Sequence, residues 1–387
     1  MTRNEAQSIR RRDLLTGAAA LGVLGVSAPP LALAAHPAPP PAQGLGAIAA
    51  SKGILFGASL AVHELDRDHG ERYQELYIRD AHILTSELEF KLSTLRPKHD
   101  VLDFYGADRL IGFAAGHAMS VRAHTLIWDD DVPDWIHRLA PAGISALLYM
   151  HIETIMRRYA GRIRYWDVVN EPIGPWDSKP GNLRAGPFYR ALGEDYIARA
   201  FRAARAVAPS DILVLNEAQC ETADENGETF RTSLLALLRR LKDQGVPIDA
   251  IGFQSHLKLA AKYDLPAFTA FLNEVADLGF DIHITELDVN DSTFPGDIAV
   301  RDRAVARMYR AYLDAVLKVT AVKVVETWQL SDATSWMNDP ATQARMAIRS
   351  NPRPLPYDAS FLRKPAWDAI AEAFDAAPAR CPPSSSR

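Results

Sequence analysis

The segment Trp166-Asp167-Val168-Val169-Asn170-Glu171 is an apolar, β-branched run that ends on a carboxylate. A second run of this kind, Ile282-His283-Ile284-Thr285-Glu286-Leu287-Asp288, lies well downstream. Runs of this composition and length are typical of parallel strands that are buried on both faces. In a parallel barrel, the residues at the carboxyl ends of the strands form the active site. Each segment therefore predicts a buried strand that delivers a glutamate to one end of a barrel.

The rest of the chain repeats this strand pattern. Further apolar runs with the length of buried strands are residues 54–59, 82–87, 121–128, 212–217, 250–256 and 322–330. Amphipathic helical patterns lie between the strands, at 103–117, 144–159, 189–207, 229–244, 266–278 and 298–317. This alternation predicts an α/β fold with a single domain, a (β/α)8 or TIM barrel. The alternative is an open doubly wound sheet, which would bring a Gly-rich phosphate loop after its first strand, and the sequence has no such loop.

The amino-terminal residues have the pattern of a secretory signal. Arg10-Arg11-Arg12 precedes an apolar stretch at 18–34, and Ala32-Leu33-Ala34 fits a small-residue cleavage site. Paired arginines followed by Asp13-Leu14-Leu15 favour the twin-arginine route, so we expect export to the periplasm or the extracellular space. A membrane anchor is the alternative, but glycines and Pro29-Pro30 interrupt the run. The expected division is a signal peptide at 1–34, a Pro/Ala-rich linker at 35–50, a catalytic domain at 51–376 and a disordered tail at 377–387.

The net charge indicates which binding partners to expect, and the two cysteines decide whether a disulfide is possible. Removing residues 1–34 takes away four arginines and two acidic residues, so the net charge of −5 becomes −7, with no basic run. We therefore expect no nucleic-acid partner, no stable membrane association after signal removal, and a monomer. Cys220 and Cys381 are the only cysteines. An exported protein permits one disulfide between them, but two free thiols are the preferred prediction.

The residues at the predicted carboxyl ends of the strands are acids, amides, imidazoles and indoles. They are Glu87, His124, Trp128, Asn170, Glu171, Asn216, Gln254, His256, Glu286, Asp288 and Trp328. Acids and amides hydrogen-bond to hydroxyl groups, and indole faces stack on sugar rings, so this set is typical of a carbohydrate site. Two glutamates on different strands also suit glycoside hydrolysis by double displacement. No histidine pair has the spacing of metal ligands, so we expect no metal and no other cofactor.

Several spaced motifs in one order resemble the retaining xylanases of glycoside hydrolase family ten, over residues 54 to about 372. They are Trp-Asp-Val-Val-Asn-Glu-Pro around Glu171, Ile-Thr-Glu-Leu-Asp around Glu286, Gly252 to Leu257, Thr85-Ser86-Glu87 with Lys91, His124 to Trp128, Trp328 ahead of Ser335-Trp336, and Lys364-Pro365-Ala366-Trp367. The resemblance implies a barrel that cleaves internal β-1,4-xylosidic bonds of xylan.

The resemblance also implies a role for individual residues. Glu171 would be the general acid/base and Glu286 the nucleophile, with His256 and Asp288 holding Glu286 in a His–carboxylate network. Asn170 would contact the sugar 2-hydroxyl at the cleavage point. The expected substrate-binding residues are Glu87, Lys91, His124, Trp128, Gln254, Trp328 and Trp336. Each residue alone also has a purely structural interpretation, as a helix cap, an ion-pair partner, a core histidine or a core aromatic.

The chain departs from the family pattern at four places near the expected sugar site. Leu88 stands where the family usually has a sugar-binding asparagine, and Asp129-Asp130-Asp131 replaces His-Ser-Gln. Asn216-Glu217-Ala218-Gln219 replaces Asn-Asp-Tyr-Asn, and Gln329 stands where glycine is common. We expect the three aspartates to add negative charge beside the catalytic centre and to disfavour acidic substituents.

Two alternatives to an endo-acting xylanase stay open. One is a related retaining hydrolase that acts on short xylo-oligosaccharides, aryl glycosides or another β-linked glycan. The other is a non-catalytic sugar-binding barrel. Retention of both glutamates together with His256 and Asp288 disfavours the binder, because binding alone does not need the complete network.

Overall fold

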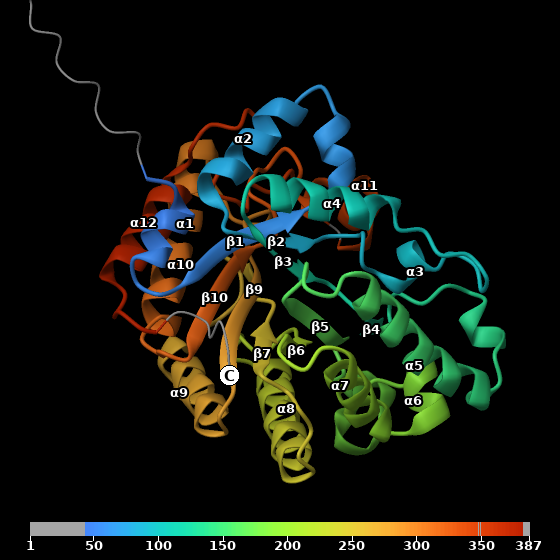
Figure 1. Cartoon of the computed structure of the whole chain (residues 1–387). Helices are drawn as coiled ribbons and strands as arrows, with labels where there is room; N and C mark the ends of the chain where they lie inside the picture. The colour runs from blue at the N-terminus through green and yellow to red at the C-terminus, as the bar shows by residue number, and fades with distance from the viewer. Residues whose placement is uncertain (1–42, 347, 349, 382–387) are drawn as a thin grey trace, which may run out of the picture. The chain divides into compact units, whose positions relative to one another are not determined.

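The strands form one closed parallel barrel in the computed structural model, which describes residues 43–381 except 347 and 349 (Figure 1). The strand order is β10-β1-β2-β3-β5-β6-β7-β9, and pairing of β10 with β9 closes the barrel. The strands are β1 Leu55–Leu60, β2 Ile83–Ser86, β3 Ser120–Ala123, β5 Tyr165–Asn170, β6 Ile212–Glu217, β7 Ala250–Phe253, β9 Asp281–Asn290 and β10 Val322–Thr327. The predicted (β/α)8 barrel is confirmed.

Two of the predicted strands are interrupted. Residues 121–128 form β3 and the short β4, Ile127–Trp128, while residues 250–256 form β7 and the beginning of β8, His256–Lys258. β4 pairs with β5, and β8 pairs with β9. Ser255, between β7 and β8, has a positive φ of 61°, which an extended strand does not allow. The breaks turn the chain at the carboxyl end of the barrel, where loops carry functional side chains.

Helices lie around the outside of the barrel (Figure 1). They are α1 Leu45–Ala50, α2 Gly70–Asp80, α3 Leu92–Leu95, α4 Tyr105–Gly116, α5 Pro141–Arg158, α6 Pro187–Leu192, α7 Asp195–Val207, α8 Glu225–Asp243, α9 Leu265–Asp277, α10 Ile298–Val316, α11 Pro340–Arg345 and α12 Pro365–Ala376. The helix predicted at 189–207 is two helices, because Gly193 ends α6 with a φ of 64°. α8 begins earlier than predicted because the Asp224 carboxylate accepts a hydrogen bond from the Gly227 N–H and caps it.

The ordered structure extends past both predicted boundaries of the domain. α1 occupies residues assigned to the linker at 35–50, with Leu45 and Ala49 fully buried, and the Leu45 N–H donates to Asp80 Oδ1 at 3.0 Å. At the other end, the Arg380 guanidinium donates to the carbonyls of Leu317 and Val322, so residues 377–381 contact the barrel. Apolar burial and these hydrogen bonds hold both segments on the domain. The signal peptide at 1–34, the linker up to residue 42 and the tail at 382–387 lie outside the described residues.

Cys220 is buried and Cys381 is exposed, and both are free thiols. The prediction of two free thiols is confirmed. Burial raises the pKa of the Cys220 thiol well above its usual range, so this side chain is an unreactive part of the core.

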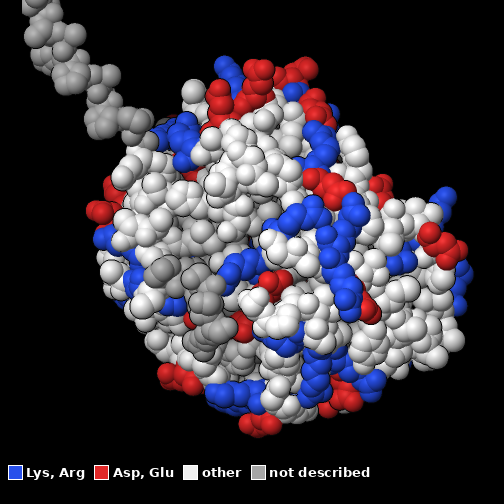
Figure 2. Space-filling model, viewed as in Figure 1, with Lys and Arg blue, Asp and Glu red and all other residues white. Residues whose placement is uncertain are grey.

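The described surface carries both signs of charge. On the face shown in Figure 2, Lys and Arg form a band that runs beside scattered Asp and Glu. Exposed ion pairs are common, for example Arg157 with Glu153 at 2.9 Å and Arg239 with Glu274 at 3.2 Å. Such pairs contribute little to the free energy of unfolding. They place positive and negative side chains next to each other on the surface. Among residues 43–381, apart from 347 and 349, no helix is long and apolar enough to cross a membrane.

His151 on α5 should make the fold less stable in acid. Its ring is fully buried, neither nitrogen has a hydrogen-bond partner, and burial together with the nearby charge of Arg96 lowers its pKa to about 3. Between an unfolded pKa of about 6.5 and the folded value, only the unfolded chain binds the proton, so stability falls as pH falls. His151→Leu should reduce the loss of unfolding free energy between pH 7.5 and 4.5 by about 3 kcal/mol, measured by urea unfolding. The control is His117→Leu at an exposed ring; equal pH dependence of wild type and His151→Leu would contradict the prediction.

Candidate active site

The carboxyl ends of the strands open into two joined hollows. The first, of about 760 Å³, is lined by Glu87, Asn170, Glu286 and other residues. The second, of about 500 Å³, extends toward the loops that follow β6 and β7. The two hollows share Glu171, Gln254, His256 and Trp336, whereas Glu286 lines only the first. The two glutamates therefore lie where the hollows meet.

Glu286 is held by hydrogen bonds from both sides. Its Oε1 accepts from Asn216 Nδ2 at 2.9 Å, and its Oε2 lies 3.1 Å from His256 Nε2. His256 Nδ1 lies 2.9 Å from Asp288 Oδ2, which also accepts from the Trp336 indole at 2.8 Å. The structure thus brings together the predicted network of Glu286, His256 and Asp288. Trp336 orients Asp288, and so contributes to the network as well as to the cleft wall.

The electrostatics of this network keep Glu286 ionised. Burial alone would raise the pKa of Glu286, but the hydrogen bond from His256 and the charges of His124, His256 and Arg122 lower it to about 2. Burial alone would likewise lower the pKa of His256, but Asp288 and Glu286 raise it well above its usual range. Glu286 is therefore an anion and His256 a cation at neutral pH, which is the charge state that a carboxylate nucleophile needs.

A buried layer of charged side chains lies below Glu286 in the barrel interior. The Arg122 guanidinium donates to both oxygens of Asp167 at 2.7 to 2.9 Å and to Glu326 Oε2 at 3.0 Å. Asp167 Oδ2 also lies 2.8 Å from His124 Nδ1, which fixes the ring that faces the cleft. Sequence reasoning placed His124 in the site but missed Arg122, because an arginine inside a strand gives no signal that it points inward.

Glu171 is held by two donors, of which one, Gln254, is among the predicted substrate-binding residues. Gln254 Nε2 donates to its Oε1 at 2.8 Å, and Arg184 Nη2 donates to its Oε2 at 2.8 Å. Arg184 is nearly buried and also donates to the Glu171 carbonyl at 3.0 Å. Sequence reasoning missed Arg184, because it lies in the loop after β5, away from any strand end. Arg184 therefore fixes both the side chain and the backbone of Glu171.

Asn170 presents a free donor to the cleft. Its Oδ1 accepts from Asn216 Nδ2 at 2.9 Å, while its own Nδ2 is buried without a partner. Thr285 Oγ1 donates to Asn216 Oδ1 at 2.8 Å and so fixes which way the Asn216 amide points. Buried polar atoms are normally paired, so the unpaired Nδ2 of Asn170 is available to a ligand hydroxyl beside Glu286. Asn216 links β5 to β9 through these bonds.

Aromatic rings form the walls of the first hollow. The buried Trp328 meets the rings of His124 and His256 edge-on, with centroids 5.5 and 6.2 Å away. Lys91 Nζ lies 5.2 Å from the centre of the Trp128 ring. All the predicted binding residues line this hollow: Glu87, Lys91, His124, Trp128, Gln254, Trp328 and Trp336.

The expectation for the three aspartates was largely wrong. Only Asp130 lines the cleft, and it forms an ion pair with Arg184, which offsets its charge. Asp131 accepts hydrogen bonds from the N–H and the hydroxyl of Ser93 at 3.0 and 2.6 Å. Asp129 is turned toward the Phe188 N–H, and burial raises its pKa to about 7. Two of the three carboxylates therefore bind N–H groups in the first turns of α6 and α3, and the cleft gains little negative charge.

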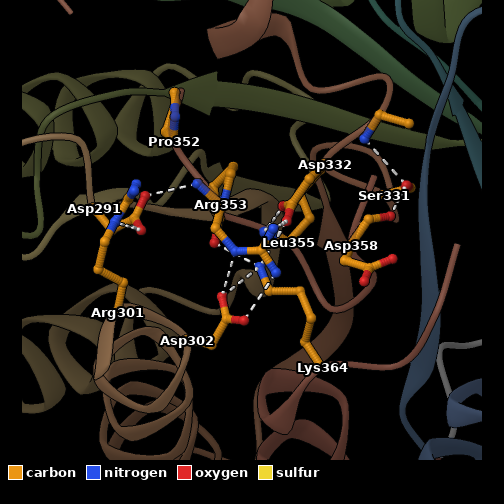
Figure 3. A network of polar contacts seen from close by, with 12 residues as sticks. Asp291, Arg301, Asp302, Ser331, Asp332, Pro352, Arg353, Leu355, Asp358 and Lys364 are labelled. Atoms are coloured by element: carbon orange, nitrogen blue, oxygen red, sulfur yellow. Dashed lines mark hydrogen bonds and ion pairs between the residues drawn. The ribbon is translucent and has the colours of Figure 1, made fainter. Parts of the chain in front are cut away.

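A polar network behind the cleft fixes the segment that carries Trp336 (Figure 3). Lys364, from the Lys-Pro-Ala-Trp motif, donates to Asp332 Oδ2 at 2.9 Å. Arg353 makes two bonds of 2.8 Å to Asp302 on α10, and its N–H donates to Asp291 at 2.7 Å. The network joins the chain after β10 to α10 and to the end of β9, so Trp336 reaches Asp288 from an anchored segment.

The described residues contain no group of three or more His, Cys, Asp or Glu side chains arranged to hold a metal ion. The chemistry available to this site is that of two carboxyl groups. One is held ionised by a buried His–carboxylate network, and the other faces both hollows. A pair of this kind can attack and protonate opposite sides of a bond placed between the hollows.

Comparison with known proteins gives one family. The model of "Glycosyl hydrolase family 10" matches residues 44–373. Endo-1,4-beta-xylanase B of Thermotoga neapolitana is 29% identical over 309 residues, which are 79% of this chain and 84% of that protein. Endo-1,4-beta-xylanase C of Phanerodontia chrysosporium is 31% identical over 295 residues, which are 76% of this chain and 69% of that protein.

Solved structures agree with this result. The crystal structure of native xylanase 10B from Thermotoga maritima has a TM-score of 0.77 at 29% identity, and the match covers 86% of this chain and 98% of that one. Xylanase 10B from Thermotoga petrophila RKU-1 in complex with xylobiose has a TM-score of 0.76 at 28% identity, with 86% and 97% covered.

Proposed function

The chain belongs to glycosyl hydrolase family 10, and we propose that it is an endo-1,4-beta-xylanase that cleaves internal bonds of xylan with retention of configuration. The observation that carries the proposal is the placement of Glu171 and Glu286 at the junction of two hollows, with Glu286 held ionised. Relatives named as endo-1,4-beta-xylanases support the choice of xylan. Hollows on both sides of the glutamates suit a bond inside a polymer, because sugars extend in both directions from it.

The first step joins the glycone to Glu286. Because a nucleophile must reach the anomeric carbon of the glycone sugar, and Glu286 lines only the first hollow, the glycone occupies that hollow. Glu286 attacks this carbon while Glu171, carrying a proton, gives it to the leaving oxygen, and the aglycone departs through the second hollow. The free Nδ2 of Asn170 donates to the 2-hydroxyl of the sugar as charge develops on the ring.

The second step releases the glycone. With the aglycone gone, Glu171 removes a proton from a water molecule that enters the second hollow, and the water attacks the glycosyl–Glu286 ester. Arg184 and Gln254 hold the Glu171 carboxyl group in position for this step. The His256 cation then stabilises the departing Glu286 carboxylate. Two inversions at one carbon give net retention.

Incubation with xylan tests the proposal. Wild-type protein should release short xylo-oligosaccharides, followed by chromatography, and the first product detected by proton NMR should be the β-anomer. Glu286→Gln is the matched control and should release none. Absence of products from xylan would overturn the proposed substrate. An α-anomer as the first product would overturn the retaining mechanism.

We also propose that the protein is exported through the twin-arginine route. The support is the sequence pattern of residues 1–34. Replacing Arg10, Arg11 and Arg12 with lysine should leave the precursor in the cytoplasm of a bacterial host, as cell fractionation would show. Unchanged export of this variant would contradict the route.

Leu88→Asn should improve binding on the glycone side. Leu88 lines the first hollow and is 39% exposed, but its side chain cannot hydrogen-bond to a hydroxyl. An amide there should add a bond worth about 0.5 to 1.5 kcal/mol and lower KM for an aryl xylobioside by about 2- to 10-fold. Steady-state kinetics measures this, with Ile78→Asn at an exposed position of α2 as the control. An unchanged or higher KM for Leu88→Asn would show that residue 88 does not face the sugar.

A further inference from the structure

Gln329, next to the cleft, has a strained backbone conformation and a buried side-chain oxygen without a hydrogen-bond partner. It follows Trp328 after β10 and has a φ of 74°, in the left-handed region that favours glycine. The side chain is 2% exposed, and its Oε1 is buried without a hydrogen-bond partner. A non-glycine residue in this region and an unpaired buried acceptor both cost stability. Positions that carry such costs occur preferentially at functional sites.

The other amide atom of Gln329 holds a carboxylate of the cleft wall. Gln329 Nε2 donates to Glu87 Oε2. Glu87 follows β2 and Gln329 follows β10, and both strands pair with β1, so the contact spans the mouth of the barrel above β1. Glu87 Oε1 accepts no hydrogen bond from any residue in the described part of the chain, and Glu87 is partly exposed in the first hollow. One carboxyl oxygen is therefore fixed and the other is free.

The position of this contact assigns it to the glycone side. Glu87 and Gln329 line the first hollow, as Glu286 does, and neither lines the second. Neither residue makes a hydrogen bond or an ion pair with Glu171 or Glu286, whereas Asn170 and His256 belong to the hydrogen-bonded network around Glu286. Asn170 and His256 thus surround the sugar being cleaved. Glu87 and Gln329 line the same hollow outside this network, and neither lines the second hollow.

We infer that Gln329 is a positioning residue for the second glycone sugar, holding Glu87 so that its free oxygen faces the hydroxyls of that sugar. This inference rests on the proposed function. Burial raises the pKa of Glu87 to about 7, against the opposing effects of the Gln329 hydrogen bond and the Lys91 charge, so the amide also helps keep Glu87 an acceptor. A glycine at residue 329 would relieve the backbone but leave Glu87 without its partner.

The test compares two substrates that differ by one glycone sugar. Gln329→Gly should lower kcat/KM for an aryl β-xylobioside about 10-fold, and the loss for the corresponding aryl β-xyloside should be several times smaller. Because the left-handed conformation suits glycine, the melting temperature should be equal to or higher than that of wild type. Gln329→Glu, which places a second carboxylate against Glu87, should show the same selective loss.

Ala118→Gly is the matched control. Ala118 also has a positive φ, 54°, but it is exposed in the turn between α4 and β3. This variant should relieve the same kind of strain and leave both substrates unaffected. Equal losses on the two substrates, or no loss, in Gln329→Gly would overturn the inference while the proposed function stands. If wild type hydrolyses neither glycoside nor xylan, the proposed function is wrong, and so is this inference, which rests on it.

Discussion

Glu286→Gln is expected to lower kcat on xylan by about 10⁴-fold or more, because it removes the carboxylate that we propose as the nucleophile. Glutamine has nearly the same volume, so the walls of the first hollow stay in place. Its amide cannot act as a nucleophile, and the His256 cation loses an ionic partner. The loss should be of this order on an aryl xylobioside too, because an activated leaving group does not replace the nucleophile. Initial rates on both substrates measure this, and thermal unfolding shows that the variant is folded.

Glu89→Gln is the control for Glu286→Gln. Glu89 is also a buried glutamate, but it lines neither hollow and accepts the Val62 N–H at 2.7 Å, which a glutamine oxygen can also do. Its activity should stay within about threefold of wild type, because the side chain lies outside both hollows and can keep its hydrogen bond to the Val62 N–H. Activity of Glu286→Gln within tenfold of wild type would remove Glu286 from the nucleophile role.

The barrel and the positions of Glu171 and Glu286 could be predicted because their signals are local. Each strand is a short apolar run, and each glutamate comes directly after the last buried positions of its run, as in Val168-Val169-Asn170-Glu171. A buried strand has a fixed direction in a parallel barrel, so its last residues must lie at the carboxyl end. Residue type and position along the run were therefore enough to bring Glu171 and Glu286 to one site.

The supporting residues could not be predicted because their roles depend on tertiary contacts. Arg184 reaches Glu171 from a loop 13 positions later in the sequence, and Arg122 points into the barrel from a strand that reads as apolar. Asp129 and Asp131 look equivalent to Asp130 in the sequence, yet only the fold shows that these two accept hydrogen bonds from N–H groups in the first turns of α6 and α3. Side-chain direction at strand ends and in loops is set by packing, which spacing alone does not reveal.

The amino-terminal boundary of the domain could not be predicted from the sequence for the same reason, because α1 depends on tertiary contacts. The sequence around Leu45 is rich in Ala and Gly and follows a Pro-rich stretch, which indicates a linker. The segment is nevertheless helical, because Leu45 and Ala49 are buried against the domain and the Asp80 carboxylate binds the first free N–H of the helix. A short helix of low intrinsic stability depends on such tertiary contacts.

Glu171→Ala is the second prediction with a large expected effect, and its size should depend on the leaving group. Xylan has a poor leaving group that needs the proton from Glu171, so kcat should fall by about 10²- to 10⁴-fold. A dinitrophenyl xylobioside leaves without protonation, so formation of the glycosyl ester should fall by less than about tenfold. Pre-steady-state release of dinitrophenol measures this step separately from hydrolysis of the ester. Equal losses on both substrates would contradict the acid role.

The residues around Glu171 allow a second measurement on the Glu171→Ala variant, which is recovery of activity by a small anion. In Glu171→Ala, Arg184 keeps its ion pair with Asp130 and its position 5.2 Å from the Trp176 ring, so its guanidinium should remain in place. Removal of the carboxylate leaves a space beside this cation, and a small anion such as azide should bind there. Azide needs no general base to attack the glycosyl ester, so turnover of the dinitrophenyl xylobioside should recover and yield a β-xylobiosyl azide. Azide should leave the Glu286→Gln variant inactive, because that variant forms no ester. An α-azide, or recovery in Glu286→Gln, would contradict the assignment of the two glutamates.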